Sequence, residues 1–227
     1  LMDPLRVQGE RLVDAAGRAV WLRGVCVGGW MNLESFINGH PGAEHMLRRA
    51  MADALGPSKA QFFFERLLDH VLADADLAFI KACGANVVRL PLNYHHFEAD
   101  AAPGRYREEG FARLERTVRA CAAHGLYAIL DLHAVQGCQS PDWHCDNAHR
   151  QALFWRHPHF QDRFVALWRR LAERFAGVAT VAGYNVMNEP VSGAPNGRVS
   201  HDNAPDWAQL NPVNRRVVAA IREVDRE

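Results

Sequence analysis

Short strands rich in β-branched residues alternate with amphipathic helices along the chain, and this alternation predicts an α/β protein with a parallel sheet. Two architectures share that pattern, an open doubly wound sheet and a closed (β/α)8 barrel. The first strand lacks the glycine-rich phosphate turn that is typical of doubly wound folds. Polar residues follow the strand ends, where barrels place their sites. We therefore predict a (β/α)8 TIM-barrel type of fold with only its first four βα units present.

The chain opens with an expected β-hairpin over residues 5–14, with a turn at 15–18, which should cap the bottom of the barrel. A β-branched run over 20–27 gives the first strand, and a long connection follows it. In that connection the apolar spacing predicts a short helical piece over 43–55 and a helix over 62–82.

The second strand is expected over 86–90 and is stopped by Pro91, since proline has no amide N–H to give to a sheet. Glycines mark the ends of two later helices, as they often do. The remaining expected elements are helix 109–123, strand 126–133, helix 159–175, strand 180–188 and helix 206–225. No repeat, low-complexity tract or linker interrupts them. We therefore expect residues 1–227 to be the N-terminal half of a (β/α)8 barrel domain, with the hairpin in 1–19 and the four βα units in 20–227.

The charge and the hydrophobic pattern of the sequence argue against nucleic-acid binding and against a membrane span. The 227 residues contain 26 Lys plus Arg and 26 Asp plus Glu, so the formal net charge is zero. Such a chain has no basic field to hold nucleic acid or an anionic membrane. No window approaches the ~18 uninterrupted apolar residues of a membrane span. The N-terminus shows no signal peptide, and the localisation stays open between cytoplasmic and secreted, because the chain starts at Leu1 and can have been trimmed.

Five cysteines at irregular spacing argue against a disulfide framework. Cys138, His144, Cys145 and His149 suggest a zinc site, but their spacings do not match the compact ligand pairs of structural zinc. We expect no metal and no cofactor. A disulfide between Cys138 and Cys145 remains an alternative if the protein is secreted.

The tripeptide Asn188-Glu189-Pro190 is the strongest indication of a catalytic residue in the sequence. A carboxylic acid at the mouth of a barrel strand can give its proton to a leaving oxygen, and the preceding amide can bind a sugar hydroxyl. An ordinary turn before a loop has the same composition. Arg89 and His133 sit at the ends of the second and third strands, on the inward face by period-two alternation. An inward arginine must contact substrate or form a structural ion pair. Asp131, deeper on that face, is expected to satisfy buried partners.

Four segments resemble glycoside hydrolase family 5, the cellulase-type family in the clan of (β/α)8 retaining glycosidases. They are Trp21-Leu22-Arg23-Gly24-Val25 leading to Gly28-Gly29-Trp30, Val88-Arg89-Leu90-Pro91, Leu130-Asp131-Leu132-His133 and Asn188-Glu189-Pro190. The resemblance implies that Glu189 is the acid/base and that Asn188 binds the sugar 2-hydroxyl. It also implies that Arg89 holds the nucleophile and that His133 contacts substrate. The family's nucleophile, a second Glu on strand seven, is missing from this chain.

The loop after the third strand is rich in residue types that bind sugars. Trp143 can stack on a pyranose ring, with Asp142 and His144 bonding its hydroxyls. Trp30 and Tyr94 can do the same from the first two strands, although loop packing explains each aromatic residue equally well.

Together these features predict a retaining O-glycosyl hydrolase acting on a β-linked glucan, mannan or glycoconjugate, with a carbohydrate substrate as its partner. The alternative is a catalytically inactive half-barrel that binds carbohydrate or assembles with a partner half. Its exposed edges would favour self-association. Membership of another family of the same clan would keep the role of Glu189 and change the substrate.

Overall fold

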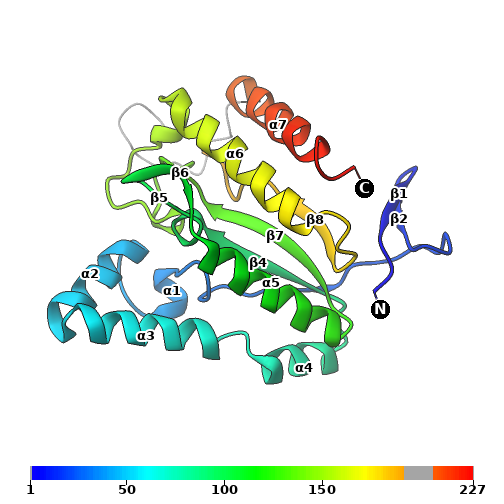
Figure 1. The fold of residues 1–227 in the computed structure, drawn as a ribbon, viewed down its shortest axis with the longest axis horizontal. Helices are drawn as coiled ribbons and strands as arrows, with labels where there is room; N and C mark the ends of the chain where they lie inside the picture. Colours follow the sequence, from blue (N-terminus) through cyan, green and yellow to red (C-terminus); the bar gives the residue numbers. More distant parts are fainter. Residues whose placement is uncertain (1, 192–206, 227) are drawn as a thin grey trace.

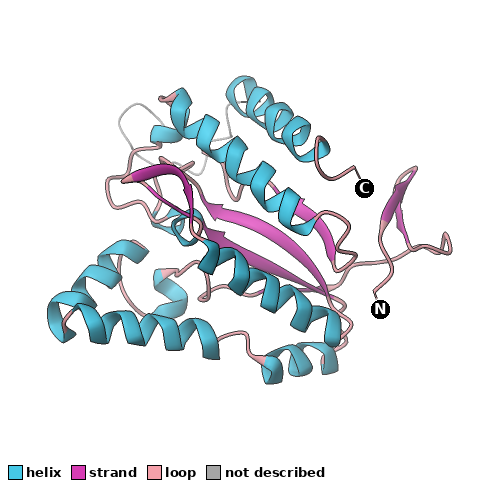
Figure 2. Cartoon of the chain, in the orientation of Figure 1, coloured by secondary structure: helices cyan, strands magenta, loops and turns pink. Residues whose placement is uncertain are grey.

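A central parallel sheet organises the molecule. The computed structural model describes residues 2–191 and 207–226 (Figure 1). Four strands form this sheet in the order β3-β4-β7-β8, which is their order along the chain. Their bounds are Gly24–Cys26, Val87–Asn93, Tyr127–Ala134 and Val181–Asn185. All three pairings are parallel, so the expected parallel sheet is confirmed, and it forms a partial barrel wall (Figure 2).

Seven α-helices are described, and α5 and α6 lie across the outer face of the sheet (Figure 1). They are α1 Ser35–Asn38, α2 Glu44–Leu55, α3 Pro57–His70, α4 Asp74–Ala82, α5 Glu108–Ala123, α6 Pro158–Phe175 and α7 Trp207–Arg222. The core lies between α5, α6 and alternate residues of the two central strands, such as Leu90 and Leu130. Period-two alternation then turns Arg89 and Asp131 toward the opposite, inner face.

Several boundaries differ from the expectation. The N-terminal hairpin is shorter, with β1 Arg6–Gln8 and β2 Arg11–Val13 joined at Gly9, whose φ of 62° suits a tight turn. Residues 15–18 form a second turn, in which the Asp14 carboxylate accepts the amides of Ala16 and Arg18. The first barrel strand contracts from 20–27 to three residues.

The helix expected over 62–82 is two helices, α3 and α4. Leu72 between them has a φ of 60°, which no α-helix accommodates, and the Asp76 carboxylate caps the amide of Ala73 to restart the chain as α4. The expectation that Pro91 stops the second strand is also wrong. The Arg89 carbonyl accepts the amide of Val27, and the Asn93 amide donates to the Met31 carbonyl, so alternate residues of β4 point toward the segment after β3. Pro91 lies between them and points to the same side. Because β3 has already ended there, no sheet hydrogen bond is lost at Pro91.

Short secondary structure between β4 and α5 was not expected. Strands β5 Glu98–Ala99 and β6 Ala102–Tyr106 form an antiparallel pair over the C-terminal end of the sheet (Figure 1). Buried Glu98 fixes this pair, since it accepts the amide of Gly104 and the guanidinium of Arg163 on α6. Among the described residues, no helix is long and apolar enough to cross a membrane.

Gly24 permits the close pairing of β3 with β4. A Cβ built on it would lie 1.7 Å from the carbonyl oxygen of Val87, so any larger residue must push the two strands apart. We expect Gly24→Ala to lower the free energy of unfolding by about 1–3 kcal/mol, as overpacked sites do. Urea titration followed by circular dichroism measures this change.

The matched control is Gly183→Ala on β8, where no atom lies within 4 Å of the added Cβ. That variant should lose less than about 0.5 kcal/mol, as substitutions that disturb no contact do. Equal losses in the two variants would show that β3 is not packed against β4 as described.

Candidate active site

Polar side chains lie together on the inner face of the sheet, where strands β4, β7 and β8 end. The register places Pro91 beside Asp131 and Asp131 beside Asn185, so residues of β4, β7 and β8 meet at one level. Arg89 on β4 donates to Asn185 and Asn188 and forms an ion pair with Asp131. Its Nη2 lies 3.0 Å from Asp131 Oδ2 and 2.8 Å from Asn188 Oδ1, and its Nε lies 2.9 Å from Asn185 Oδ1. Of the two roles expected for an inward arginine, substrate contact or a structural ion pair, the structure shows the ion pair with Asp131.

His133 connects this arginine network to the mouth of the site. The guanidinium of Arg89 can only donate, so the side-chain atom of Asn188 that faces it is the oxygen Oδ1. The Asn188 Nδ2 group therefore faces His133 Nε2 at 3.1 Å and donates to it. Nε2 therefore acts as an acceptor, and Nδ1 carries the proton that is donated to Asp131 Oδ2 at 2.7 Å. Asp131, with no exposed surface, holds both Arg89 and His133, which is the role expected of it.

Glu189 leaves the end of β8 in an unusual backbone conformation. Its φ is 39°, in the left-handed region, which costs of order 1–3 kcal/mol in a residue other than glycine. The amide of Asn188 bonds to the carbonyl of Leu132 on β7, so the chain turns just after an anchored residue. The Glu189 side chain is 70% exposed and its Oε2 lies 3.6 Å from His144 Nε2. The carboxylate thus projects from the sheet beside a buried imidazole.

Gln139 holds the ends of β7 and β8 together. It is fully buried, and its amide nitrogen lies 2.7 Å from the His133 carbonyl and 2.9 Å from the Asn188 carbonyl. Its own backbone carbonyl accepts the amide of Val191. Sequence reasoning missed Gln139 because a loop glutamine gives no periodic signal and its partner Asn188 is 49 residues away.

Glu34 is a second carboxylate that sequence reasoning missed. It lies in the connection after β3, nearly buried, with Oε1 3.5 Å from His133 Nε2. Burial raises the pKa of this carboxyl, and the negative charge of Glu189 adds to the shift. A buried acid between a histidine and Glu189 is suited to accept a sugar hydroxyl. No strand directly precedes it, so the strand-end rule did not mark it.

Trp30 and Tyr94 do not face the site. Trp30 is 1% exposed, and its indole N–H donates to the Leu68 carbonyl at 3.0 Å. Tyr94 is buried, and its hydroxyl donates to Asp100 Oδ2 at 2.8 Å. The expectation that these rings stack on a sugar is corrected: both pack in the protein, because each ring fills core space while its one polar atom finds a protein acceptor.

Of the three expected residues in the loop after β7, His144 lies beside Glu189, whereas Asp142 and Trp143 line a separate cavity that Met46 of α2 also borders. The carboxylate of Asp142 accepts the amide of Trp143 at 2.7 Å, and Trp143 packs edge-on against Phe36 with ring centroids 5.6 Å apart. Asp142 and Trp143 border a cavity of about 540 Å³. His144 is buried, and its carbonyl accepts the side-chain amide of Asn32 at 3.3 Å.

The contact between His144 and Glu189 gives a titration prediction. Burial lowers the pKa of His144, and the negative charge of Glu189 partly offsets this by favouring the protonated ring. Glu189→Gln removes that charge, so we expect the His144 pKa to fall further. The C–H resonances of the imidazole in a pH titration measure it.

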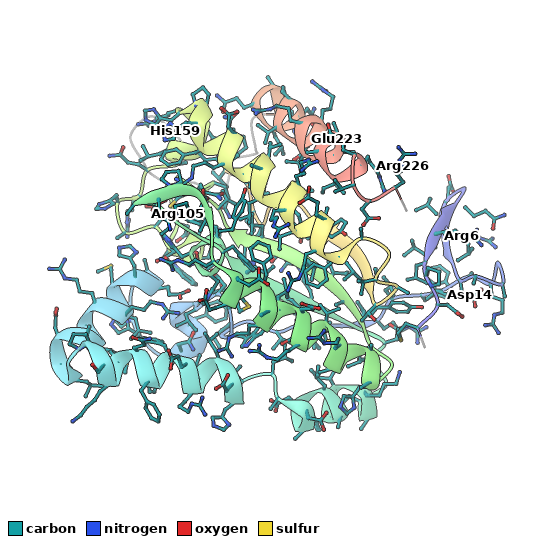
Figure 3. All side chains as sticks on the ribbon, in the orientation of Figure 1. Arg6, Asp14, Arg105, His159, Glu223 and Arg226 are labelled. Atoms are coloured by element: carbon teal, nitrogen blue, oxygen red, sulfur yellow. The ribbon has the colours of Figure 1, made fainter. Side chains whose placement is uncertain are left out.

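Glu223→Gln, at the end of α7 (Figure 3), is the matched control and should leave the His144 pKa unchanged. An unchanged His144 pKa in Glu189→Gln would contradict the contact itself.

Metal and disulfide expectations concern the same loop. In residues 2–191 and 207–226, no group of three or more His, Cys, Asp or Glu side chains is arranged to hold a metal ion. All five cysteines, including Cys138 and Cys145, are free thiols in this structure.

Comparison with known proteins identifies the family. A family model described as Cellulase (glycosyl hydrolase family 5) matches residues 64–227. The chain belongs to glycosyl hydrolase family 5. The four segments that resembled this family therefore indicated it correctly. Glu189, Asn188, Arg89 and His133 all lie within the matched region.

Named relatives differ in what they act on. A β-xylosidase of Phanerodontia chrysosporium is 44% identical over 99% of this chain and 44% of its own length. Endoglucanase C of Acetivibrio thermocellus is 29% identical over 74% of this chain and 44% of its own length. The crystal structure of an endogalactoceramidase matches 98% of this chain and 50% of its own, with a TM-score of 0.66 at 22% identity, which shows the fold alone. The chain spans about half the length of these relatives.

Proposed function

We propose that the protein is a retaining glycoside hydrolase that cleaves β-glycosidic bonds, with Glu189 as its acid/base. One observation carries the proposal. Glu189 projects from the end of β8 in a left-handed conformation, directly after Asn188, which is locked to His133 and Arg89. Strained residues at a strand end of a barrel cluster where chemistry occurs. Membership of the family supports the same assignment.

The proposed reaction uses two carboxyl groups. One carboxylate attacks the anomeric carbon while Glu189 gives its proton to the departing oxygen. A glycosyl-enzyme ester forms, and Glu189, now ionised, takes a proton from the water that attacks the same carbon and releases the sugar. Asn188, His133 and Glu34 are placed to bind hydroxyls of the sugar in this site. Arg89 would hold the second carboxylate beside Asp131.

The second carboxylate is proposed to lie outside residues 1–227. In the described part of the chain, His133 contacts two buried carboxylates: Asp131, which is committed to Arg89 and His133, and Glu34, which follows no strand directly. The relatives are about twice as long as this chain. We therefore propose that residues 1–227 are the N-terminal half of the catalytic domain, with the hairpin in 1–19 and the first four barrel units in 20–227.

A β-xyloside is the first substrate to test, because the relative that matches almost the whole chain is named a β-xylosidase. Nitrophenyl β-xyloside, β-glucoside and β-mannoside should be compared under identical conditions, with proton NMR of the first anomer released. The proposal expects hydrolysis of at least one with a β-configured first product. An α-configured first product would contradict retention.

Unpaired sheet edges favour a second candidate, a half-barrel without activity that binds carbohydrate or assembles with a partner half. Strands β3 and β8 each pair on one side only in the described sheet, and Val25 is 50% exposed. Such edges promote association with another chain. Sedimentation of residues 1–227 with and without xylo-oligosaccharide tests it. A dimer of residues 1–227 that binds sugar, together with no hydrolysis of the three glycosides by the longest form of the protein, would favour this candidate over the first.

A further inference from the structure

A cavity of about 540 Å³ lies between the start of α2 and the loop that follows β7. Met46, Pro141 and Trp143 form part of its apolar wall, and Asp142 and Arg150 supply its charged groups. Cavities that bind small ligands usually measure about 300–1,000 Å³ and combine mostly apolar walls with a few polar groups. The size and the lining of this cavity therefore suit a ligand that is partly apolar and partly polar.

Trp143 differs from the packed tryptophans of the chain. Trp30, Trp155 and Trp168 each donate the indole N–H to a backbone carbonyl, at 2.8–3.0 Å. The ring of Trp143 is half-buried and packs edge-on against Phe36, but in residues 2–191 and 207–226 its indole N–H has no acceptor. A packed indole usually finds an acceptor for this group. The free donor at the cavity wall therefore favours a ligand contact over loop packing as the role of this ring.

Two charged side chains at the cavity also keep free hydrogen-bonding capacity. Asp142 Oδ1 accepts the amide of Trp143, and no described residue donates to Oδ2. The guanidinium of Arg150 has no carboxylate within ion-pair distance in the described part of the chain. The φ of 54° at Arg150 is a conformation that the surrounding loop must hold. One acceptor and one donor of opposite charge suit the hydroxyls of a neutral sugar better than a phosphate or a carboxylate.

One side chain connects the cavity to the proposed acid/base. Trp143 directly precedes His144, and the centroids of their two rings lie 6.3 Å apart. His144 Nε2 in turn lies 3.6 Å from Glu189 Oε2. A sugar ring bound against Trp143 would therefore lie beside the reacting sugar and would not take its place.

We propose that this cavity is a subsite for a second sugar residue of the substrate, which stacks on Trp143 and bonds through its hydroxyls to Asp142 and Arg150. The subsite rests on the proposed glycosidase function and narrows it. The substrate is then a β-linked oligosaccharide or polysaccharide, with one residue at Glu189 and a neighbouring residue in the cavity. A glycoside with a single sugar ring fills only one of the two places.

The indole N–H of Trp143 reports on the cavity directly. Xylotriose, cellotriose and mannotriose are titrated into the longest form of the protein, in which Glu189→Gln prevents hydrolysis, while proton–nitrogen NMR spectra follow the indole resonances. Trp143→Phe identifies the resonance by its loss. We expect at least one trisaccharide to shift this resonance with saturation. No shift with any of the three, or saturable binding that leaves this resonance in place, would overturn the subsite.

Substitutions at the cavity wall test the contacts. Arg150→Gly removes the guanidinium and keeps a residue that accepts a φ of 54°. It should weaken the Kd of the trisaccharide by about tenfold, as the loss of a hydrogen bond to a charged group does. Trp143→Ala should weaken it by about tenfold or more. Trp207→Ala at the start of α7, where the ring is 59% exposed, is the matched control and should leave the Kd unchanged. An unchanged Kd in both cavity variants would contradict the proposal.

Inorganic phosphate tests the alternative ligand. A shift of the Trp143 resonance by phosphate and by none of the trisaccharides would rule out a neutral sugar in the cavity. None of these measurements requires turnover. Hydrolysis of the nitrophenyl glycosides without trisaccharide binding at Trp143 would remove the subsite alone. Trisaccharide binding at Trp143 without any hydrolysis would keep the cavity as a sugar site and remove the proposed activity.

Discussion

Replacing Glu189 by Gln is expected to lower the turnover of an alkyl β-glycoside by about 10²–10⁴-fold, the usual contribution of a positioned acid or base. Glutamine keeps the shape of the side chain at the end of β8 but has no proton to donate to the leaving oxygen. The effect should be measured as kcat on the longest form of the protein that hydrolyses the unsubstituted substrate. Glu223→Gln, just after the end of α7, is the matched control, and it should retain full turnover.

The leaving group distinguishes an acid from a residue that only binds substrate. A dinitrophenyl glycoside departs without proton transfer, so its first step should be much less sensitive to Glu189→Gln than that of the alkyl glycoside. A residue that acts only in binding would impair both substrates equally and mainly through KM. Equal losses on the two substrates would therefore remove the acid/base assignment.

Asp131→Ala is expected to lower the free energy of unfolding by about 3 kcal/mol, since removing one partner of a buried ion pair leaves the other charge uncompensated. Asp131 has no exposed surface, forms an ion pair with Arg89 and accepts a hydrogen bond from His133, so the substitution removes both interactions at once. Arg89 keeps about a quarter of its side-chain surface, and water can reach it, which places the effect at the low end of the range for buried pairs. Urea unfolding measures the change.

Asp162→Ala provides the control for that experiment. Asp162 on α6 pairs with Arg216 on α7, and both side chains are largely exposed. Exposed pairs contribute about 0–1 kcal/mol, so the control should be nearly neutral. If Asp131→Ala were as mild as Asp162→Ala, the network that holds His133 and Arg89 would not be the rigid base of the site.

Period-two alternation and strand-end position could predict the inner face of the sheet. These rules place Arg89, Asp131 and His133 together because parallel strands end at one edge. In the structure Asp131 Oδ2 lies 2.7 Å from His133 Nδ1 and 3.0 Å from Arg89 Nη2. The same reasoning located Asn188 and Glu189 at the end of the fourth barrel strand.

Side chains that depend on long-range packing could not be predicted in this way. An aromatic ring after a strand has the same sequence signature whether it faces a sugar or the core, and Trp30 and Tyr94 face the core. Glu34 and Gln139 come from loops without periodicity, and their partners lie on other strands. The expectation for Pro91 fails because its missing N–H points to the side of β4 where β3 has already ended. The sequence alone does not show where β3 ends.

Rescue of Glu189→Gly by azide tests the acid/base assignment most directly. Glycine tolerates the φ of 39° found at this position, so the substitution removes the carboxylate without adding backbone strain. With a dinitrophenyl β-glycoside, the variant should accumulate a glycosyl-enzyme that lacks a base to activate water. Azide needs no base, so its addition should restore turnover and yield a β-configured glycosyl azide, which NMR identifies. An α-configured azide, or no rescue at any azide concentration, would contradict a retaining mechanism with Glu189 as acid/base.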